Sequence, residues 1–128
     1  MDDPHSTDGL GAASPSYHDY VEACLLLVLV ERPAYGYELK EQLDGLGLPG
    51  FDRGRIYRVL RGLEAVGAVV SHWETAQRGP ARRTYELTDA GHDRLRAHVH
   101  AVRGQRRRLT RFLTRFERLV LTAEEAVA

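Results

Sequence analysis

The sequence predicts a mainly α-helical fold with one small β-hairpin and a long C-terminal helix. Three observations favour this class. Apolar residues recur at helical spacing in several segments, two short β-branched and aromatic runs flank a Gly-Pro turn, and a heptad pattern fills the last third of the chain. The length of 128 residues suits one compact domain, and 43% hydrophobic with 28% charged residues is typical of soluble globular proteins.

The chain divides into four predicted parts. Residues 1–16 are rich in Gly, Pro, Ser and Asp, and we expect a disordered arm. A compact domain should span residues 17–88, a C-terminal dimerisation helix residues 89–122, and a short tail residues 123–128. The apolar runs are too short to cross a bilayer and the first twenty residues are acidic and polar, so we expect a cytoplasmic protein.

The first two helices are predicted from their apolar patterns. Residues 17–30 are apolar almost all round, as in a helix buried at the centre of a domain. Pro33 ends this helix because its ring disfavours a helical conformation at the preceding residue. A second helix is expected over residues 35–46, with Leu39 and Leu43 on its inner face.

A third helix is predicted over residues 53–66. The carboxylate of Asp52 can accept hydrogen bonds from the free amides of the first turn, and Gly67 suits the C-cap. Spacings of four and three place Ile56, Leu60 and Leu63 on one face. A β-hairpin should follow, with strands at residues 69–74 and 84–87 and a long basic tip.

Positive charge is concentrated on two of these elements, although the net charge is zero. Residues 53–83 hold seven arginines against two glutamates, whereas residues 1–52 carry a balance of −8. The expected cationic residues of the third helix and the hairpin are Arg53, Arg55, Arg58, Arg61, Arg78, Arg82 and Arg83. Arginine forms bidentate contacts with phosphate and guanine, so this distribution favours a nucleic-acid surface.

The final helix, capped by Thr88, shows the clearest periodicity. Its apolar seam has spacings of four and three throughout and is interrupted only by Arg106, which fits a register-setting or solvated position. The seam consists of Leu95, Val99, Val102, Leu109, Leu113, Phe116 and Val120. A seam of this length favours a second copy of the chain as partner, and the alternative is a long helix packed back on its own domain.

The order helix, helix, helix, hairpin, helix is the plan of a winged helix-turn-helix. In this plan the third helix enters the major groove of double-stranded DNA, and the hairpin, or wing, reaches phosphates or the minor groove. Both elements are cationic here. The sequence therefore predicts a DNA-binding transcriptional regulator.

Several motifs in this order resemble the PadR-like transcriptional regulators over about residues 20–120. They are Leu26-Leu-Val-Leu-Val30, Tyr35-Gly-Tyr-Glu-Leu39, Gly54-Arg-Ile-Tyr57 with Leu60 and Leu63-Glu64, Gly79-Pro80 before Arg82-Arg83, and Tyr85-Glu-Leu-Thr-Asp-Ala-Gly91. The resemblance implies a homodimeric, usually repressive DNA-binding protein whose last helix forms the dimer. Where the family often has Ser-Pro-Gly-Thr-Leu-Tyr-Pro, this chain has Asp52-Arg-Gly-Arg-Ile-Tyr-Arg58, which makes the third helix more basic.

Individual roles follow as hypotheses. Arg55 and Arg58 should approach base edges, Arg53 and Arg61 the phosphate backbone, and the three hairpin arginines phosphates or the minor groove. Tyr57 either donates its hydroxyl to a phosphate or packs in the three-helix core. Tyr35 stands at the start of the second helix, which usually meets the DNA backbone.

Other classes of function are disfavoured. A single cysteine, Cys24, excludes an internal disulfide framework, and the histidines are not spaced as metal ligands, so we expect no metal and no cofactor. No catalytic constellation is apparent, so we expect no enzyme. Two alternatives stay open: a winged-helix module that docks on an acidic protein, and a sensor in which an aromatic ligand is the small-molecule effector. The second is what the resemblance implies, because short-form members of the family can bind flat aromatic ligands between the two dimer helices. Here Phe112 and Phe116 are the only aromatic residues of the last helix, and Phe116 alone lies in the seam.

Overall fold

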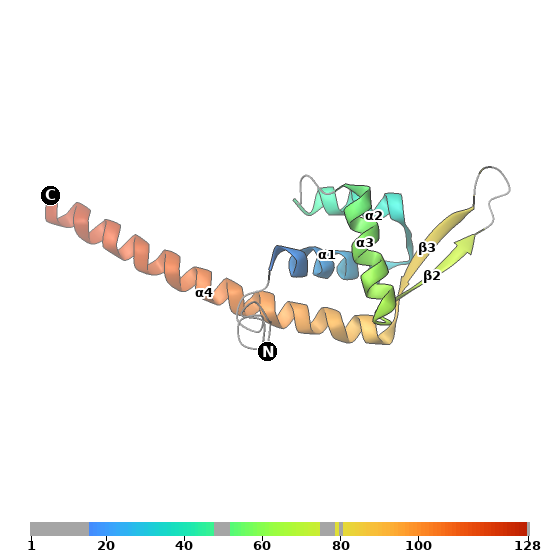
Figure 1. Cartoon of the computed structure of the whole chain (residues 1–128). Helices are drawn as coiled ribbons and strands as arrows, with labels where there is room; N and C mark the ends of the chain where they lie inside the picture. The colour runs from blue at the N-terminus through green and yellow to red at the C-terminus, as the bar shows by residue number, and fades with distance from the viewer. Residues whose placement is uncertain (1–15, 48–51, 75–78, 80, 128) are drawn as a thin grey trace, which may run out of the picture.

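A computed structural model describes residues 16–47, 52–74, 79 and 81–127. The elements follow the order α1, β1, α2, α3, β2, β3, α4. Figure 1 shows a small body built on α1, with the β2–β3 hairpin extending from one end and α4 projecting far beyond the other. The predicted fold class is confirmed. Apart from Ser16, the predicted arm lies outside the described residues.

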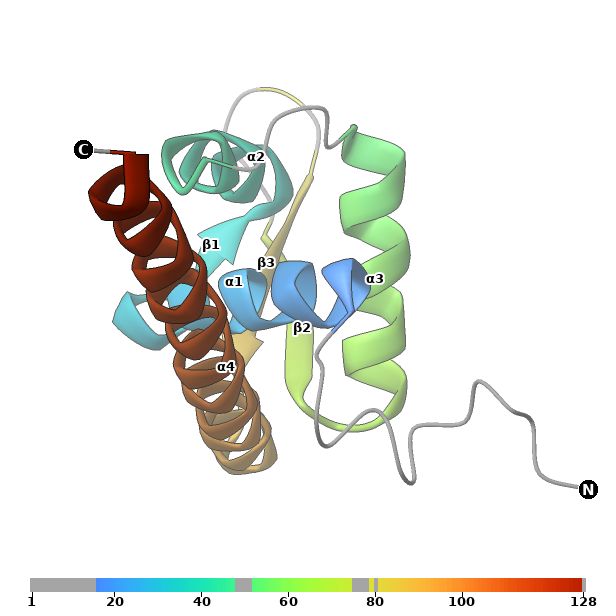
Figure 2. The same ribbon diagram turned by 90° about the vertical axis from the view of Figure 1, so that its left-hand side faces the viewer.

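Helix α1 spans Tyr17–Glu31 and forms the centre of the domain. Ser16 and Asp19 form a capping box, in which Ser16 Oγ accepts from the Asp19 amide at 3.1 Å and Asp19 Oδ2 accepts from the Ser16 amide at 3.0 Å. The backbone becomes extended at Arg32, directly before Pro33, as predicted. Figure 2 shows α1 between α4 and α3. Its buried residues are Val21, Glu22, Cys24, Leu25, Leu26 and Leu29.

Helices α2 (Gly36–Gly45) and α3 (Arg53–Ala65) pack their apolar faces against α1. Asp52 caps α3 as predicted, since its Oδ1 accepts from the Arg55 amide at 2.7 Å. Gly67 follows with a φ of 77°, a conformation that glycine adopts without strain. The core that these helices share is formed mainly by Val21, Leu25, Leu26, Leu29, Leu39, Leu43, Ile56, Leu60, Leu63 and Val69.

The sheet has three antiparallel strands in the order β1-β3-β2. Strands β2 (Val69–Glu74) and β3 (Arg82–Leu87) form the predicted hairpin, and the sequence did not predict β1 (Ala34–Tyr35). Because β1 has only two residues and pairs with β3 about fifty positions away, no local pattern indicates it. Strand β3 also begins two residues earlier than expected, so Arg82 and Arg83 belong to a strand rather than to the hairpin tip.

Helix α4 spans Asp89–Val127. Thr88 caps it, with Oγ1 accepting from the Gly91 amide at 3.0 Å. The helix continues five residues beyond the predicted end at residue 122, because the segment expected to be a tail consists of helix-forming residues without glycine or proline. Within the described ranges, no helix has both the length and the hydrophobicity needed to span a membrane.

The predicted apolar seam of α4 divides into two parts. Leu95 packs against the core of its own domain, and Val99 and Val102 line an apolar depression of about 180 Å³ beside α1. Beyond the body, the side chains of Leu109, Leu113, Phe116 and Val120 are exposed. Both interpretations of the heptad pattern therefore apply to one helix: the first three positions lie beside α1, where Leu95 packs against the core, and the last four have no partner among the described residues.

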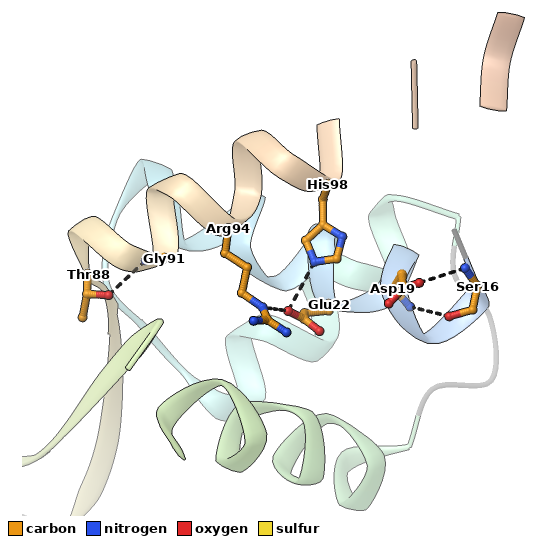
Figure 3. Close-up of polar contacts among 7 residues, drawn as sticks. All are labelled: Ser16, Asp19, Glu22, Thr88, Gly91, Arg94 and His98. Carbon is orange, nitrogen blue, oxygen red and sulfur yellow. Dashed lines mark hydrogen bonds and ion pairs between the residues drawn. The ribbon is translucent and has the colours of Figure 1, made fainter. Parts of the chain in front are cut away.

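A buried ion-pair cluster joins α1 to α4 (Figure 3). Glu22 is only 5% exposed, and its Oε1 accepts from Arg94 Nε and lies 3.2 Å from His98 Nε2. Burial alone would raise the pKa of Glu22, but the hydrogen bonds from His98 and Arg94 outweigh it and lower the pKa to about 2. No local sequence pattern indicates this cluster, because Arg94 and His98 are more than seventy residues from Glu22.

We expect this cluster to make stability depend on pH. Because the pKa of Glu22 falls from 4.5 to about 2 on folding, its contribution is complete above about pH 4.5 and disappears as the pH falls towards 2. This pKa shift contributes at most about 3 kcal/mol to the free energy of unfolding. Glu22→Gln should lower the free energy of unfolding at pH 7 and flatten its decline in acid, as measured by urea denaturation. Asp93→Asn, which removes an exposed carboxylate paired with Arg96, is the control. Identical acid profiles for Glu22→Gln and the wild type would contradict this prediction.

Candidate nucleic-acid interface

Helix α3 presents a row of arginines to solvent. Burial of Ile56, Val59, Leu60 and Leu63 turns the opposite face outwards, so that Arg53, Arg55, Arg58 and Arg61 are all exposed. The Arg55 guanidinium lies over the Tyr17 ring of α1, 5.8 Å from its centroid. The predicted cationic face of the third helix is thus present along most of α3.

Arg82 on strand β3 is held beside the start of α2 by aromatic contacts. Its guanidinium lies 5.6 Å from the centroid of the Tyr35 ring and 6.0 Å from that of Tyr37. The two tyrosine rings stack on each other, with centroids 5.7 Å apart and planes 7° from parallel. Arg82 itself is exposed, so the aromatic surface orients a guanidinium that solvent, or a phosphate, can reach.

Tyr35 also joins the start of α2 to the far strand of the wing. Its hydroxyl donates to Glu74 Oε2 on β2 at 2.5 Å. This hydrogen bond is the main reason that the pKa of Tyr35 is raised. In addition, the Tyr35 amide donates to Glu38 Oε1 at 3.0 Å, which fixes the first turn of α2. Tyr35 is therefore a connecting residue between the helix-turn-helix and the wing.

Arg83 has a different environment from its neighbour. Its Nη2 donates to Glu64 Oε2 on α3 at 3.1 Å, and its Nε donates to Ser71 Oγ on β2 at 2.9 Å. The Ser71 hydroxyl in turn donates to Glu64 Oε1 at 2.5 Å. The sequence predicts Arg83 as a DNA contact; in the structure its Nε and Nη2 are engaged within the protein, while its side chain is 36% exposed. Its contacts join the wing to α3.

The start of α2, the exposed side of α3 and the sheet enclose an open concavity of about 430 Å³. Tyr57 extends from α3 over Gly36, so closely that a Cβ at Gly36 would clash with its ring and hydroxyl. Trp73 on β2, 68% exposed, also lines the concavity. Five of the nine predicted DNA contacts line this concavity: Tyr35, Tyr57, Arg61, Arg82 and Arg83.

The other predicted contacts lie elsewhere. Arg53, Arg55 and Arg58 continue the exposed face of α3 beyond the concavity, and Arg78 lies outside the described residues. Sequence reasoning did not place Trp73 or Tyr37 in this site. Trp73 lies on a strand whose residues alternate between two faces, and Tyr37 lies at the start of α2. Both positions are compatible with packing as well as with binding, so the sequence does not decide between these roles. In the described ranges, no group of three His, Cys, Asp or Glu residues is arranged to hold a metal ion.

Three helices, an antiparallel wing and a cationic third helix define a winged helix-turn-helix protein. The family model of the transcriptional regulator PadR-like family matches residues 25–97, more than half of the chain. The chain therefore belongs to this family of transcriptional regulators.

Solved structures support the same assignment. A protein described as a transcriptional regulator of Thermoplasma acidophilum has a TM-score of 0.69 and 29% identity, over 76% of this chain and 93% of the other. A PadR family transcription regulator from Clostridium difficile has a TM-score of 0.66 and 25% identity, over 73% and 98%. PadR of Bacillus subtilis, solved in complex with operator DNA, shares the fold with a TM-score of 0.54 and 22% identity, over 60% of this chain and 45% of the other. No curated protein sequence matches the chain significantly.

The two adjacent wing arginines should respond differently to substitution. Arg83→Ala removes the half-exposed ion pair with Glu64 and the hydrogen bond to Ser71, and should lower the free energy of unfolding by about 1 kcal/mol. Arg82→Ala, at an exposed position, should change it by less than about 0.5 kcal/mol. Chemical denaturation of both variants tests this difference. Equal losses, or a larger loss for Arg82→Ala, would contradict the assignment of Arg83 to a structural role.

Proposed function

We propose that this regulator is a homodimeric repressor that binds a specific operator in double-stranded DNA through α3 and the wing. The observation that carries the proposal is the meeting of Arg61 from α3 with Arg82 from β3 at one concavity. A cationic helix and a cationic wing on the same surface can contact a duplex together, the helix in the major groove and the wing on the adjacent backbone. The operator complex of Bacillus subtilis PadR, which shares the fold, supports this arrangement.

Each side chain has a role that follows from its position. Arg55 and Arg58 lie in the first two turns of α3 and would contact base edges, where arginine recognises guanine. Arg53 and Arg61 flank them and would contact phosphates, together with Arg82 from the wing. Tyr57 lines the concavity, and its hydroxyl is a further donor to a phosphate. Arg83 keeps the wing in place and is not included among the contacts.

The exposed half of the α4 seam supports a dimer of this chain. It is called the apolar stripe here and consists of Leu109, Leu113, Phe116 and Val120. Large apolar side chains are rarely left as a continuous stripe on a monomer, and heptad spacing matches a helical partner. The stripe continues into the apolar depression beside α1, which Tyr20 and Leu27 also line. A twofold pair joined here would present two α3 helices to one face of a duplex, as palindromic operators require.

Arg58→Ala should weaken binding of DNA from upstream of the chain's own gene by roughly 10- to 100-fold, because a bidentate contact to guanine contributes about 1–3 kcal/mol. Six to eight phosphate contacts predict a log–log salt dependence with a slope of roughly −5 to −7. Fluorescence anisotropy at several salt concentrations measures both quantities. Arg96→Ala, an exposed arginine of α4 paired with Asp93, is the control and should bind normally.

The same titration separates this proposal from the module that docks on an acidic protein. Only an operator-binding protein retains a preference for its upstream DNA in the presence of excess competitor duplex. Unchanged affinity of the double variant Arg55→Ala/Arg58→Ala, or no preference over competitor, would contradict the proposed function.

The dimer can be tested with two matched substitutions on α4. Phe116 is 57% exposed and lies in the apolar stripe, whereas Leu121 is 58% exposed and lies off it. Phe116→Glu should give a monomer, because it places a charge in the helix–helix contact, and Leu121→Glu should remain a dimer. Size-exclusion chromatography with light scattering gives the mass. A monomeric wild type, or the same mass for both variants, would contradict this assembly.

A further inference from the structure

Helix α4 carries a second cationic surface that the operator contact does not use. Arg107, Arg111, Arg115 and Arg118 follow one another at spacings of four, four and three residues and are all exposed. Here these four residues are called the arginine ridge. Eleven residues of helix separate its ends, a length of about 16 Å.

The ridge faces away from both the winged-helix body and the apolar stripe. At about 100° per residue, each ridge arginine lies roughly 130–170° around the helix from the middle of the stripe. Arg94, Leu95 and His98, which contact α1 and the core, lie on the side of the stripe. If the stripe joins two copies, the ridge therefore stays on the outside of the dimer.

The charge of the ridge is not neutralised by neighbouring acids. Among the described residues of α4, the ion pairs involve Arg94, Arg96 and His98, and none involves the ridge. Arginines spaced four apart repel each other and destabilise a helix, and a helix face that serves only solubility commonly alternates the two signs of charge. The ridge thus has the electrostatic character of a surface for an anionic partner.

The composition of the ridge selects among anionic partners. Protein interfaces depend on aromatic or apolar anchors, and single-stranded nucleic acids on aromatic rings that stack with bases. All four ridge positions are arginine, Thr114 lies between them, and the nearest exposed aromatic ring, that of Phe112, lies off the row, roughly 60–140° around the helix from the ridge arginines. A regular phosphate backbone needs only guanidinium groups, and about 16 Å corresponds to roughly five base pairs of a duplex.

We propose that the arginine ridge binds the backbone of a second DNA duplex without sequence preference, so that the dimer can bridge two DNA segments. Figure 2 shows α1 between α3 and α4. Because the ridge lies on the side of α4 opposite to Arg94 and His98, which contact α1, it faces away from α3. The duplex held by α3 and the wing is therefore not the one that the ridge faces. Bridging rests on the proposed operator binding, whereas binding of a duplex to the ridge alone does not.

The first experiment isolates the ridge. In the background Arg58→Ala/Arg61→Ala/Arg82→Ala, a random-sequence duplex should still bind at low salt, with a log–log salt slope of roughly −3 to −4 for four phosphate contacts. Adding Arg107→Gln/Arg111→Gln/Arg118→Gln should reduce this affinity at least tenfold. Glutamine has a helix propensity similar to that of arginine, so circular dichroism and the dimer mass should be unchanged.

The matched control removes three cations away from the ridge. Arg32→Gln/Lys40→Gln/Arg96→Gln changes the net charge equally, but each of these residues is paired with an acid in the protein. This variant should bind the random duplex within twofold of the background. Equal losses in the ridge and control variants, or no loss in either, would overturn the proposal. Tighter binding of a polyglutamate peptide than of duplex at the same ionic strength would also overturn it.

A second experiment measures bridging. Wild-type protein on immobilised operator DNA should capture a labelled random duplex, whereas the ridge variant in the wild-type background should bind the operator normally and capture none. Equal capture by both proteins contradicts the inference. The two proposals can also fail separately. If the wild type does not recognise the operator, but the ridge substitutions still abolish binding of the random duplex, the proposed function is contradicted and the ridge assignment is supported.

Discussion

The candidate interface depends on the contact between Glu64 of α3 and Arg83 of β3, with Ser71 of β2 between them. The wing is anchored in the core by Val69 of β2 and Tyr85 of β3. The hydrogen bonds among Glu64, Ser71 and Arg83 help to set the angle of the wing to α3. That angle decides whether Arg61 and Arg82 contact the same duplex. Glu64 therefore supports the interface indirectly, by holding Arg83, although its own negative charge is repelled by DNA.

Local patterns predicted the helices well and the long-range contacts poorly. Asp52, Gly67 and Thr88 indicated helix ends because capping depends on residues that are neighbours in sequence. The roles of Arg82 and Arg83 could not be separated, since the difference between an oriented contact and an internal ion pair arises from partners on other elements. Glu22 was missed for the same reason, because burial of a charge is visible only once its distant partners are placed.

Helix α4 combines three surfaces whose order along and around the helix explains its length. Its first turns are fixed to α1 by the Glu22 cluster, its distal apolar stripe is proposed to join a second copy, and its outer side carries the arginine ridge. The sequence does not show which part of the seam lies beside α1 and which part is exposed, because both parts follow the same heptad spacing. Only packing against α1 separates Val102 from Leu109.

The arrangement of the DNA contacts determines the spacing of the two half-sites in the operator. Two α3 helices related by a twofold axis must contact half-sites separated by about one helical turn or a multiple of it. A hydroxyl-radical footprint on DNA from upstream of the chain's own gene measures this spacing directly. We expect two symmetric protected regions that disappear in the Arg58→Ala/Arg61→Ala/Arg82→Ala variant. No protection by the wild type, or protection that persists in this variant, would show that α3 and the wing do not form the DNA contact.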